Sequence, residues 1–223
     1  MHRLYHLPLS PFCRKIRLVL AEKRIEVELI EERPWEKRLD FLRLNPAGQV
    51  PVLINEKNRA FCSTTAIFEY LEETVPEPPL LPTVPAARAE VRRMVDWFDD
   101  KFNREVTENL VFERVTKRLA KIGYPDGACL KAGSRNIRVH LDYITFLLEG
   151  HNWLAGPKMT VADLTGAAHL SCLDYVGDVP WEDYPAVRDW YAVMKSRPCF
   201  RSLLADHLPG FPTPPAHYAD LDF

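Results

Sequence analysis

The sequence lacks most of the features that mark disulfide-rich, metal-binding and membrane proteins. Its cysteines are odd in number and form no Cys-x-x-Cys pair, so we expect no disulfide framework, no zinc or other metal site, and a reducing compartment. No apolar run reaches membrane-spanning length, and no basic leader with an apolar core begins the chain. We therefore expect a soluble, cytoplasmic protein without membrane insertion. The formal net charge of −2 gives no reason to expect nucleic-acid binding.

The first 76 residues show strand patterns on both sides of a helix pattern. Four short apolar runs predict strands, at residues 4–7, 27–30, 52–54 and 60–61. Ser10 followed by Pro11 predicts a helix start, because serine caps helices and proline fits the first helical turn. The strand-helix-strand order predicts a parallel pair of strands, followed by an antiparallel hairpin. A helix over residues 65–74 would close this domain.

A proline-rich stretch separates the two halves of the chain. Residues 76–85 hold five prolines and no helical pattern, which indicates a stiff linker. The division that follows is an N-terminal domain over 1–76, a linker over 77–85, a helical domain over 86–208 and a tail over 209–223. In the helical domain, apolar residues recur at three- and four-residue steps over a long helix that fades near Ile122 and a second one that ends at Gly150. The fold class is thus α/β plus all-α.

Thr160 and Asp163 predict the start of a further helix. The Thr160 hydroxyl can accept from the Asp163 amide, while the Asp163 carboxylate reaches back to the Thr160 amide. This capping box explains both residues without a catalytic role.

Four segments resemble the glutathione S-transferase superfamily: residues 10–17, 45–53, 66–71 and 154–163. The resemblance implies a thioredoxin-like domain followed by an all-helical domain whose buried central helix begins at Thr160. It also implies a homodimer. Pro51 stands at the first residue of a strand, where an X-Pro bond can be cis.

The resemblance places a glutathione site on six residues: Ser10, Cys13, Val50, Pro51, Ser63 and Thr64. Ser10 would activate the ligand thiol at a helix N-terminus, and Val50 and Pro51 would pair with the tripeptide backbone. Each key residue also has a structural reading, because Ser10 can serve only as a helix cap and Cys13 as a small core residue.

Ser63 is the strongest departure from the family pattern. Members that bind glutathione carry Glu-Ser where this chain has Ser63 and Thr64. Losing one charge-assisted hydrogen bond weakens binding by roughly ten- to hundredfold. We therefore expect no cofactor and a vestigial site, although glutathione binding stays open.

Two further segments, Arg33-Pro-Trp-Glu36 and the closing His-Tyr-Ala-Asp-Leu-Asp-Phe, are similar to the glutathione-transferase-like cell-division proteins of α-proteobacteria. This similarity implies a homodimer that binds the tubulin-like polymer FtsZ at the division site, shapes its filaments and promotes constriction. The implied FtsZ-binding residues are Trp35, Glu113 and Leu130. The implied signalling tail comprises Tyr218, Asp220, Leu221, Asp222 and Phe223, with the septal cell-wall synthesis machinery or its regulators as its partner.

Each of these regions has an alternative interpretation. Trp35 can close over the ligand site or pack on the domain edge, and the glycine-rich connection over 123–133 can be a variable loop without a partner. The tail holds four prolines and is predicted to be extended, although Phe211 and Tyr218 can fold back onto the helical domain. Two functions remain: a non-enzymatic FtsZ-binding factor, or a serine-type glutathione S-transferase acting on electrophilic small molecules.

Overall fold

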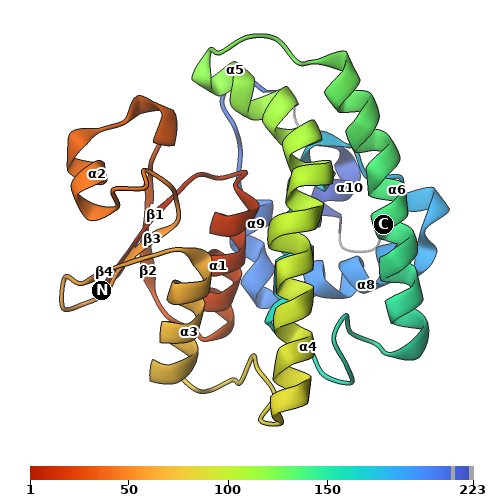
Figure 1. The fold of residues 1–223 in the computed structure, drawn as a ribbon, viewed down its shortest axis with the longest axis horizontal. Coiled ribbons are helices and arrows are strands. Elements are labelled where there is room, and N and C mark those ends of the chain that lie inside the picture. Colours follow the sequence, from red (N-terminus) through yellow and green to blue (C-terminus); the bar gives the residue numbers. More distant parts are fainter. Residues whose placement is uncertain (212–213, 221–223) are drawn as a thin grey trace. The chain divides into compact units, whose positions relative to one another are not determined.

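The computed structural model describes residues 1–211 and 214–220 and divides into two compact units (Figure 1). The first unit combines Met1–Pro79 with Pro198–Asp206. The second combines Leu80–Arg197 with the chain from His207 onward. The sequence analysis assigned all of 86–208 to the helical domain, whereas here Pro198–Asp206 groups with the sheet. Three predicted tail residues, Leu221, Asp222 and Phe223, lie outside the described residues.

A four-stranded mixed sheet of order β2-β1-β3-β4 forms the centre of the first unit. Its strands are β1 (His2–His6), β2 (Val27–Glu31), β3 (Val52–Ile54) and β4 (Ala60–Cys62). Strand β1 pairs parallel with β2 and antiparallel with β3, and β3 pairs antiparallel with β4. The predicted parallel pair and antiparallel hairpin are confirmed.

Six helical segments accompany this sheet. They are α1 (Pro11–Glu22), η1 (Pro34–Glu36), α2 (Leu39–Leu44), α3 (Thr64–Thr74), η4 (Pro198–Phe200) and α9 (Arg201–Leu204). The buried face of α1 includes Ile16, Val19 and Leu20, each fully buried. Leu4 and Leu53, which face each other across β1 and β3, are also fully buried, so the core lies between sheet and helix.

A buried ion-pair network fixes the returning segment to α1. Asp206 accepts from both terminal nitrogens of Arg17, at 2.8 and 3.0 Å, and from Arg14 at 3.1 Å. Arg17 also donates to the Ser202 carbonyl at 2.8 Å. The Arg14 and Arg17 side chains are 0% and 4% exposed, so this carboxylate compensates guanidinium charge that water does not reach.

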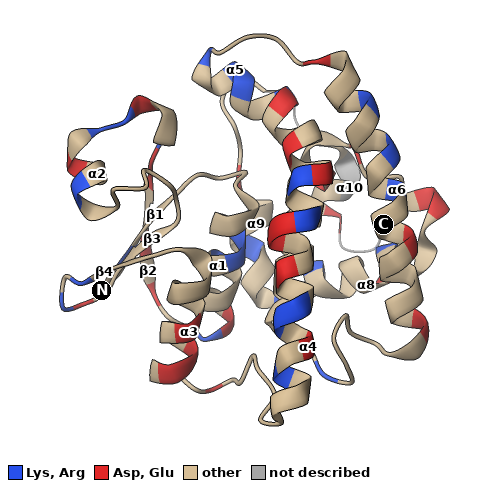
Figure 2. Cartoon of the chain, viewed as in Figure 1, with Lys and Arg blue, Asp and Glu red and all other residues tan. Residues whose placement is uncertain are grey.

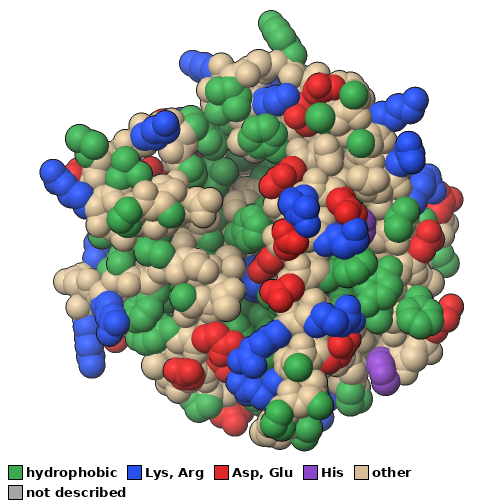
Figure 3. Space-filling view, in the orientation of Figure 1, with side chains coloured by type: hydrophobic (Ala, Val, Ile, Leu, Met, Phe, Trp, Pro, Cys, Tyr) green, Lys and Arg blue, Asp and Glu red, His purple; other side chains and the backbone are tan. Residues whose placement is uncertain are grey.

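The second unit is helical. Its segments are α4 (Pro85–Asp96), η2 (Trp97–Thr116), α5 (Lys117–Ala120), α6 (Gly127–Gly150), α7 (Val161–Val176), η3 (Trp181–Asp183), α8 (Pro185–Ser196) and α10 (Ala216–Ala219). The predicted first long helix corresponds to α4, η2 and α5, which follow one another directly, with π-helical geometry through η2. Figure 2 shows acidic and basic residues interspersed along these consecutive helices, and Figure 3 shows the same mixture of side chains on the surface above them.

Helix α7 forms the core of the second unit, and its residues from Val161 to Tyr175 are all buried. Small residues let neighbours approach closely. A Cβ added to Gly166 would lie 2.9 Å from both Phe98 and Leu154, and one added to Gly133 of α6 would lie 2.7 Å from Leu110 of η2. These contacts hold α6, η2 and α7 at close range.

The predicted extended tail is wrong for its described part. Residues Ala216–Ala219 form α10, and Tyr218 is only 2% exposed. Its ring packs edge-on against Tyr175 at 5.2 Å, and Lys195 donates to the carbonyls of Tyr218 and Asp220. Phe211 lies beneath the Arg118 guanidinium, 4.7 Å from the ring centre. The alternative, in which Phe211 and Tyr218 fold back, is therefore confirmed.

Among the described residues, no helix combines the length and the apolar character that crossing a bilayer requires.

Candidate functional site

Three connections of the first unit meet at one edge of the sheet. Tyr5 of β1 pairs with Val52 of β3, and Val52 pairs with Cys62 of β4. The chain therefore leaves β1, enters β3 and leaves β4 at the same edge. On these connections, or in the helical turns beside them, lie the residues of the predicted vestigial site: Ser10, Cys13, Val50, Pro51, Ser63 and Thr64.

Ser10 caps α1, as predicted. Its backbone is extended, and its hydroxyl accepts from the Cys13 amide at 3.4 Å while Pro11 opens the helix. Cys13 is fully buried, and its sulfur accepts from the Leu7 amide at 3.4 Å. This geometry supports the structural reading of both residues, with the thiol inside the core.

The loop before β3 is held by Asn45. The Asn45 side chain donates to the Gln49 carbonyl at 2.7 Å and accepts from the Ala47 amide at 3.2 Å. The Val50–Pro51 bond is cis, which the sequence had left open. Pro51 is buried and Val50 half-buried. Sequence reasoning read the Asn-Pro pair as a turn but missed that the Asn45 side chain organises the loop.

The residue at the position of the family's acidic clamp is a serine at the start of α3. Ser63 is exposed, stands at the N-cap of α3 without a side-chain capping bond, and has a φ of 76°. A non-glycine residue in this backbone region is strained, and such strain concentrates at functional sites. Thr64, the first residue of α3, is half-buried. The edge thus retains hydroxyls but no carboxylate at these two positions.

Trp35 lies in a loop that ion pairs brace on both sides. Arg33 donates to Glu31 at 3.1 Å. Arg38 pairs with Glu32 at 3.0 Å, and the Glu32 side chain is only 1% exposed. Within this braced loop, Trp35 occupies the short helix η1 and is half-buried. A large aromatic side chain that is partly accessible, on a loop flanked by ion pairs, suits recognition of a protein surface.

Glu113 is buried, and its carboxylate contacts other residues of the second unit. Its side chain accepts from the Asp126 amide at 2.7 Å and pairs with Lys117 at 2.7 Å, and the residue is only 5% exposed. The Asp126 amide and the Lys117 ammonium hold the pKa of the Glu113 carboxyl below its ordinary range. Asp126 in turn caps α6 by accepting from Ala128 at 2.7 Å. Glu113 therefore positions the connection into α6, a role that sequence reasoning missed.

The projecting part of this region is shorter than predicted. Gly127 to Gly133 belong to the first turns of α6, so Leu130 is a half-buried helical residue and not a loop tip. The apolar side chains that do project are Tyr124, 92% exposed, and Ile122, 59% exposed. They lie on the α5–α6 connection at the top of Figure 1.

Comparison with known families gives two matches in the order of the two units. Residues 4–79 match the glutathione S-transferase N-terminal domain, and residues 110–198 match the C-terminal domain. The chain belongs to the glutathione S-transferase family. This transferase-family chain has the expected thioredoxin-like half with its mixed sheet, followed by the helical half.

Three matches, one to a sequence and two to solved structures, cover nearly the whole transferase-family chain. FtsZ-localized protein A of Caulobacter vibrioides is 50% identical over 99% of this chain and 97% of its own. The structure of FzlA from C. crescentus superimposes with a TM-score of 0.96 at 50% identity, covering 100% of this chain and 99% of that one. A glutathione S-transferase structure from Rhodospirillum rubrum F11 also gives 0.96, at 52% identity, with full coverage of both chains.

Proposed function

We propose that this protein is a non-enzymatic cell-division factor that binds FtsZ polymers at the division site, shapes their filaments and promotes constriction. The observation that carries the proposal is the 50% identity to FtsZ-localized protein A over 99% of the chain. We further propose that the protein is cytoplasmic and a homodimer, as in the family. The sheet edge that carries the predicted glutathione-site residues supports a role without glutathione chemistry. Ser63 stands there at the position where a family carboxylate would pair with the ligand's ammonium.

We assign polymer binding to two regions, one in each unit. The first is the braced loop that carries Trp35. The second is the α5–α6 region, defined by Ile122, Tyr124 and Leu130. Glu113 belongs to the second region as a positioning residue, since its buried carboxylate is occupied by Asp126 and Lys117.

Trp35→Ala is expected to weaken the affinity for GTP-assembled FtsZ at least tenfold. The reason is that truncating an aromatic hot-spot residue typically costs about 2 kcal/mol or more, and about 1.4 kcal/mol already corresponds to a tenfold loss of affinity. Co-sedimentation over a range of polymer concentrations measures this loss. Circular dichroism of the variant checks that the fold survives.

Val193→Ala is the matched control for this experiment, because Val193 is a 51% exposed apolar residue on α8, outside both regions. It should pellet like the wild type. Leu130→Glu introduces a charge in the second region and should also abolish pelleting. Unchanged pelleting of both Trp35→Ala and Leu130→Glu would reject the assignment of both regions.

Glu113→Ala is expected to weaken FtsZ binding about tenfold, because the Asp126 amide loses its buried acceptor and the α5–α6 region loosens. Glu113→Gln keeps an oxygen for that amide and should stay within about threefold of the wild type. Hydrogen exchange of residues 121–126 should rise in the alanine variant only. Equal loss of binding in both variants, with unchanged exchange, would instead indicate a direct contact by the Glu113 charge.

The tail is proposed to carry the constriction signal, with the septal cell-wall synthesis machinery or its regulators as partner. Because Tyr218 is packed against Tyr175 and Lys195 holds the Asp220 carbonyl, truncation before Tyr218 would also disturb the helical unit. Deleting only residues 221–223 keeps Tyr218 and Asp220, and with them the contacts to Tyr175 and Lys195. The deletion should leave FtsZ pelleting unchanged and impair constriction in cells.

A serine-type glutathione S-transferase is the second candidate. It is favoured by the Ser10 hydroxyl at the N-terminus of α1. It is also favoured by the 52% identity to the glutathione S-transferase from R. rubrum. Retention on immobilised glutathione and turnover of a model electrophile, both lost in Ser10→Ala, would support it. A wild-type protein inert in both assays would reject it.

A further inference from the structure

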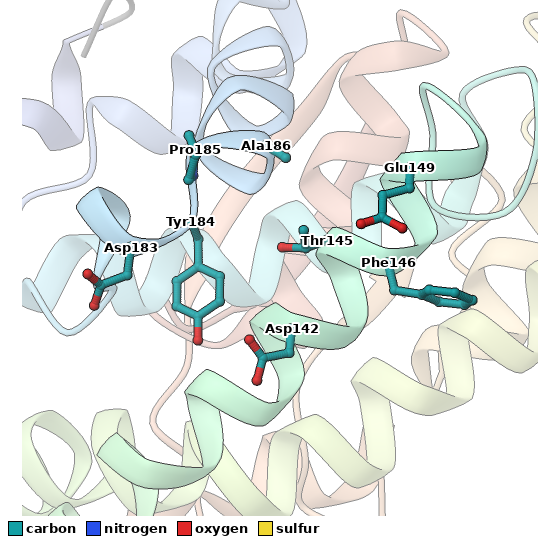
Figure 4. A pocket seen from close by; sticks show the side chains of 8 residues that line it. All are labelled: Asp142, Thr145, Phe146, Glu149, Asp183, Tyr184, Pro185 and Ala186. Atoms are coloured by element: carbon teal, nitrogen blue, oxygen red, sulfur yellow. The ribbon is translucent and has the colours of Figure 1, made fainter.

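A shallow pocket of about 250 Å³ lies between α6 and the segment that joins η3 to α8 (Figure 4). Its α6 side carries Asp142, Phe146 and Glu149, and its other side carries Asp183 and Tyr184. All of these residues belong to the second unit. None belongs to the ligand edge or to either proposed FtsZ-binding region.

An apolar stripe on α6 borders this pocket. Phe146 is 65% exposed, and Val139, seven residues earlier, is 67% exposed. Seven residues are about two helical turns, so both side chains lie on one face of α6. The core of the unit uses another face of α6, through Ile137, Leu141 and Ile144. Phe146 and Val139 are therefore accessible to a partner, and exposed large apolar side chains that lie together often mark an interface.

The rim of the pocket is acidic. Asp183 pairs with Arg138 at 2.7 Å, and the Tyr184 hydroxyl donates to the Arg138 carbonyl at 3.2 Å. Burial raises the pKa of Tyr184, and the nearby Asp142 carboxylate adds to this shift. Glu149 is exposed and has no ion pair in the portion of the chain that the structure describes. The lining thus holds three carboxylates, one of which is paired with a guanidinium, beside the apolar side chains of Phe146, Pro185 and Ala186. A ligand that fits must combine positive charge with an apolar surface.

We propose that this pocket binds a basic, extended segment of a partner protein, with cationic side chains at Asp142 and Glu149 and an apolar residue on Phe146. The spacing supports an extended segment. Asp142 and Glu149 are seven residues apart, or roughly 10.5 Å along the helix. A polyproline-II segment returns to the same face every three residues, or roughly 9.3 Å. The matching motif is therefore two basic residues separated by two others, at least one of them apolar. This site is independent of FtsZ binding.

Fluorescence anisotropy with labelled ten-residue peptides tests the site on the full-length protein. The peptide set carries two lysines at spacings of one, two, three, four and seven positions around leucine and proline. The peptide whose two lysines are three positions apart should bind most tightly. Glu149→Gln should weaken its binding about threefold, and Asp142→Asn with Glu149→Gln about tenfold, since exposed ion pairs contribute little singly. Phe146→Ala should weaken it about tenfold.

Asp189→Asn provides the matched charge control, because Asp189 is a 71% exposed carboxylate on α8 outside the pocket. It should leave peptide binding unchanged. The inference is overturned if no peptide binds below 1 mM, if peptides with glutamate in place of lysine bind equally well, or if the pocket variants bind like the wild type. A shift from dimer to monomer by light scattering in Phe146→Ala would overturn it as well, because a second copy would then cover this face.

Discussion

Replacing Asp163 by alanine is expected to lower the free energy of unfolding by about 4 kcal/mol. The carboxylate is fully buried and accepts from the amides of Leu154 and Thr160, both at 2.9 Å, and from the Trp190 indole at 3.3 Å. Alanine would leave these donors without an acceptor inside the helical core, and each buried unsatisfied donor costs about 1–3 kcal/mol. Urea denaturation followed by tryptophan fluorescence measures the change.

Two variants separate the contributions at this site. Thr160→Ala removes the cap on the Ala162 amide, at 3.2 Å, and the hydroxyl's bond to the Asp163 carboxylate, at 3.3 Å, and should cost about 1 kcal/mol. Asp163→Asn keeps one oxygen as an acceptor and should fall between the two. Burial raises the pKa of Asp163, although its hydrogen-bond donors oppose this shift. A loss below 1 kcal/mol in Asp163→Ala would contradict the structural role of the capping box.

Asp206→Ala is expected to cost about 4 kcal/mol, because it removes the carboxylate that faces Arg17 and Arg14 in the first unit. Breaking a buried ion pair by deleting one partner leaves a guanidinium without its counter-charge, and typical losses are about 3–5 kcal/mol. Chemical denaturation measures the loss. Limited proteolysis should also cut near residues 198–206 sooner in the variant, since this segment depends on Asp206 for its attachment to α1.

The exposed pair Arg43–Asp40 is a matched control in the same unit. Its side chains are 79% and 87% exposed at a separation of 3.1 Å. Asp40→Ala should cause no resolvable change, because solvent screens such pairs. Equal effects of Asp40→Ala and Asp206→Ala would show that burial does not strengthen the network.

His6 adds a pH dependence to this network. Burial, followed by Arg17, lowers its pKa from 6.5 to about 4, against an opposing effect of Asp206. The unfolded chain therefore binds a proton at His6 between these values while the folded chain does not, so this contribution to stability is lost as the pH falls from 6.5 to 4. His6→Gln should show a shallower decline than the wild type over this window.

The elements of this fold that were predicted correctly depend on residues close together in the chain. The Ser10 cap acts on Cys13, and Thr160 and Asp163 cap each other, so short-range hydrogen bonds define both helix starts. The four strands follow from short apolar runs bounded by turns. The family motifs are similarly local, which is why they could be recognised before the structure.

The features that were missed depend on distant residues. Glu113 was predicted to contact FtsZ. The spacing of apolar residues along η2 does not reveal that the Glu113 carboxylate accepts from the Asp126 amide. Nothing in the sequence indicated that Asp206 is important, since it accepts hydrogen bonds from Arg14 and Arg17, almost two hundred positions earlier in the chain. The tail appeared extended because prolines disfavour long helices, yet burial of Tyr218 against Tyr175 outweighs that preference.

The sequence by itself therefore determined the family, the succession of strands and helices along the chain, and the helix caps. These depend on hydrogen bonds and on spacings of apolar residues that span only a few positions. Only the tertiary structure decided which charged groups are buried and which aromatic groups are accessible. Those properties depend on desolvation, and desolvation is set by packing between segments that are far apart in the chain. Tyr124 is thus exposed and Tyr218 buried, although both are tyrosines next to proline-containing turns.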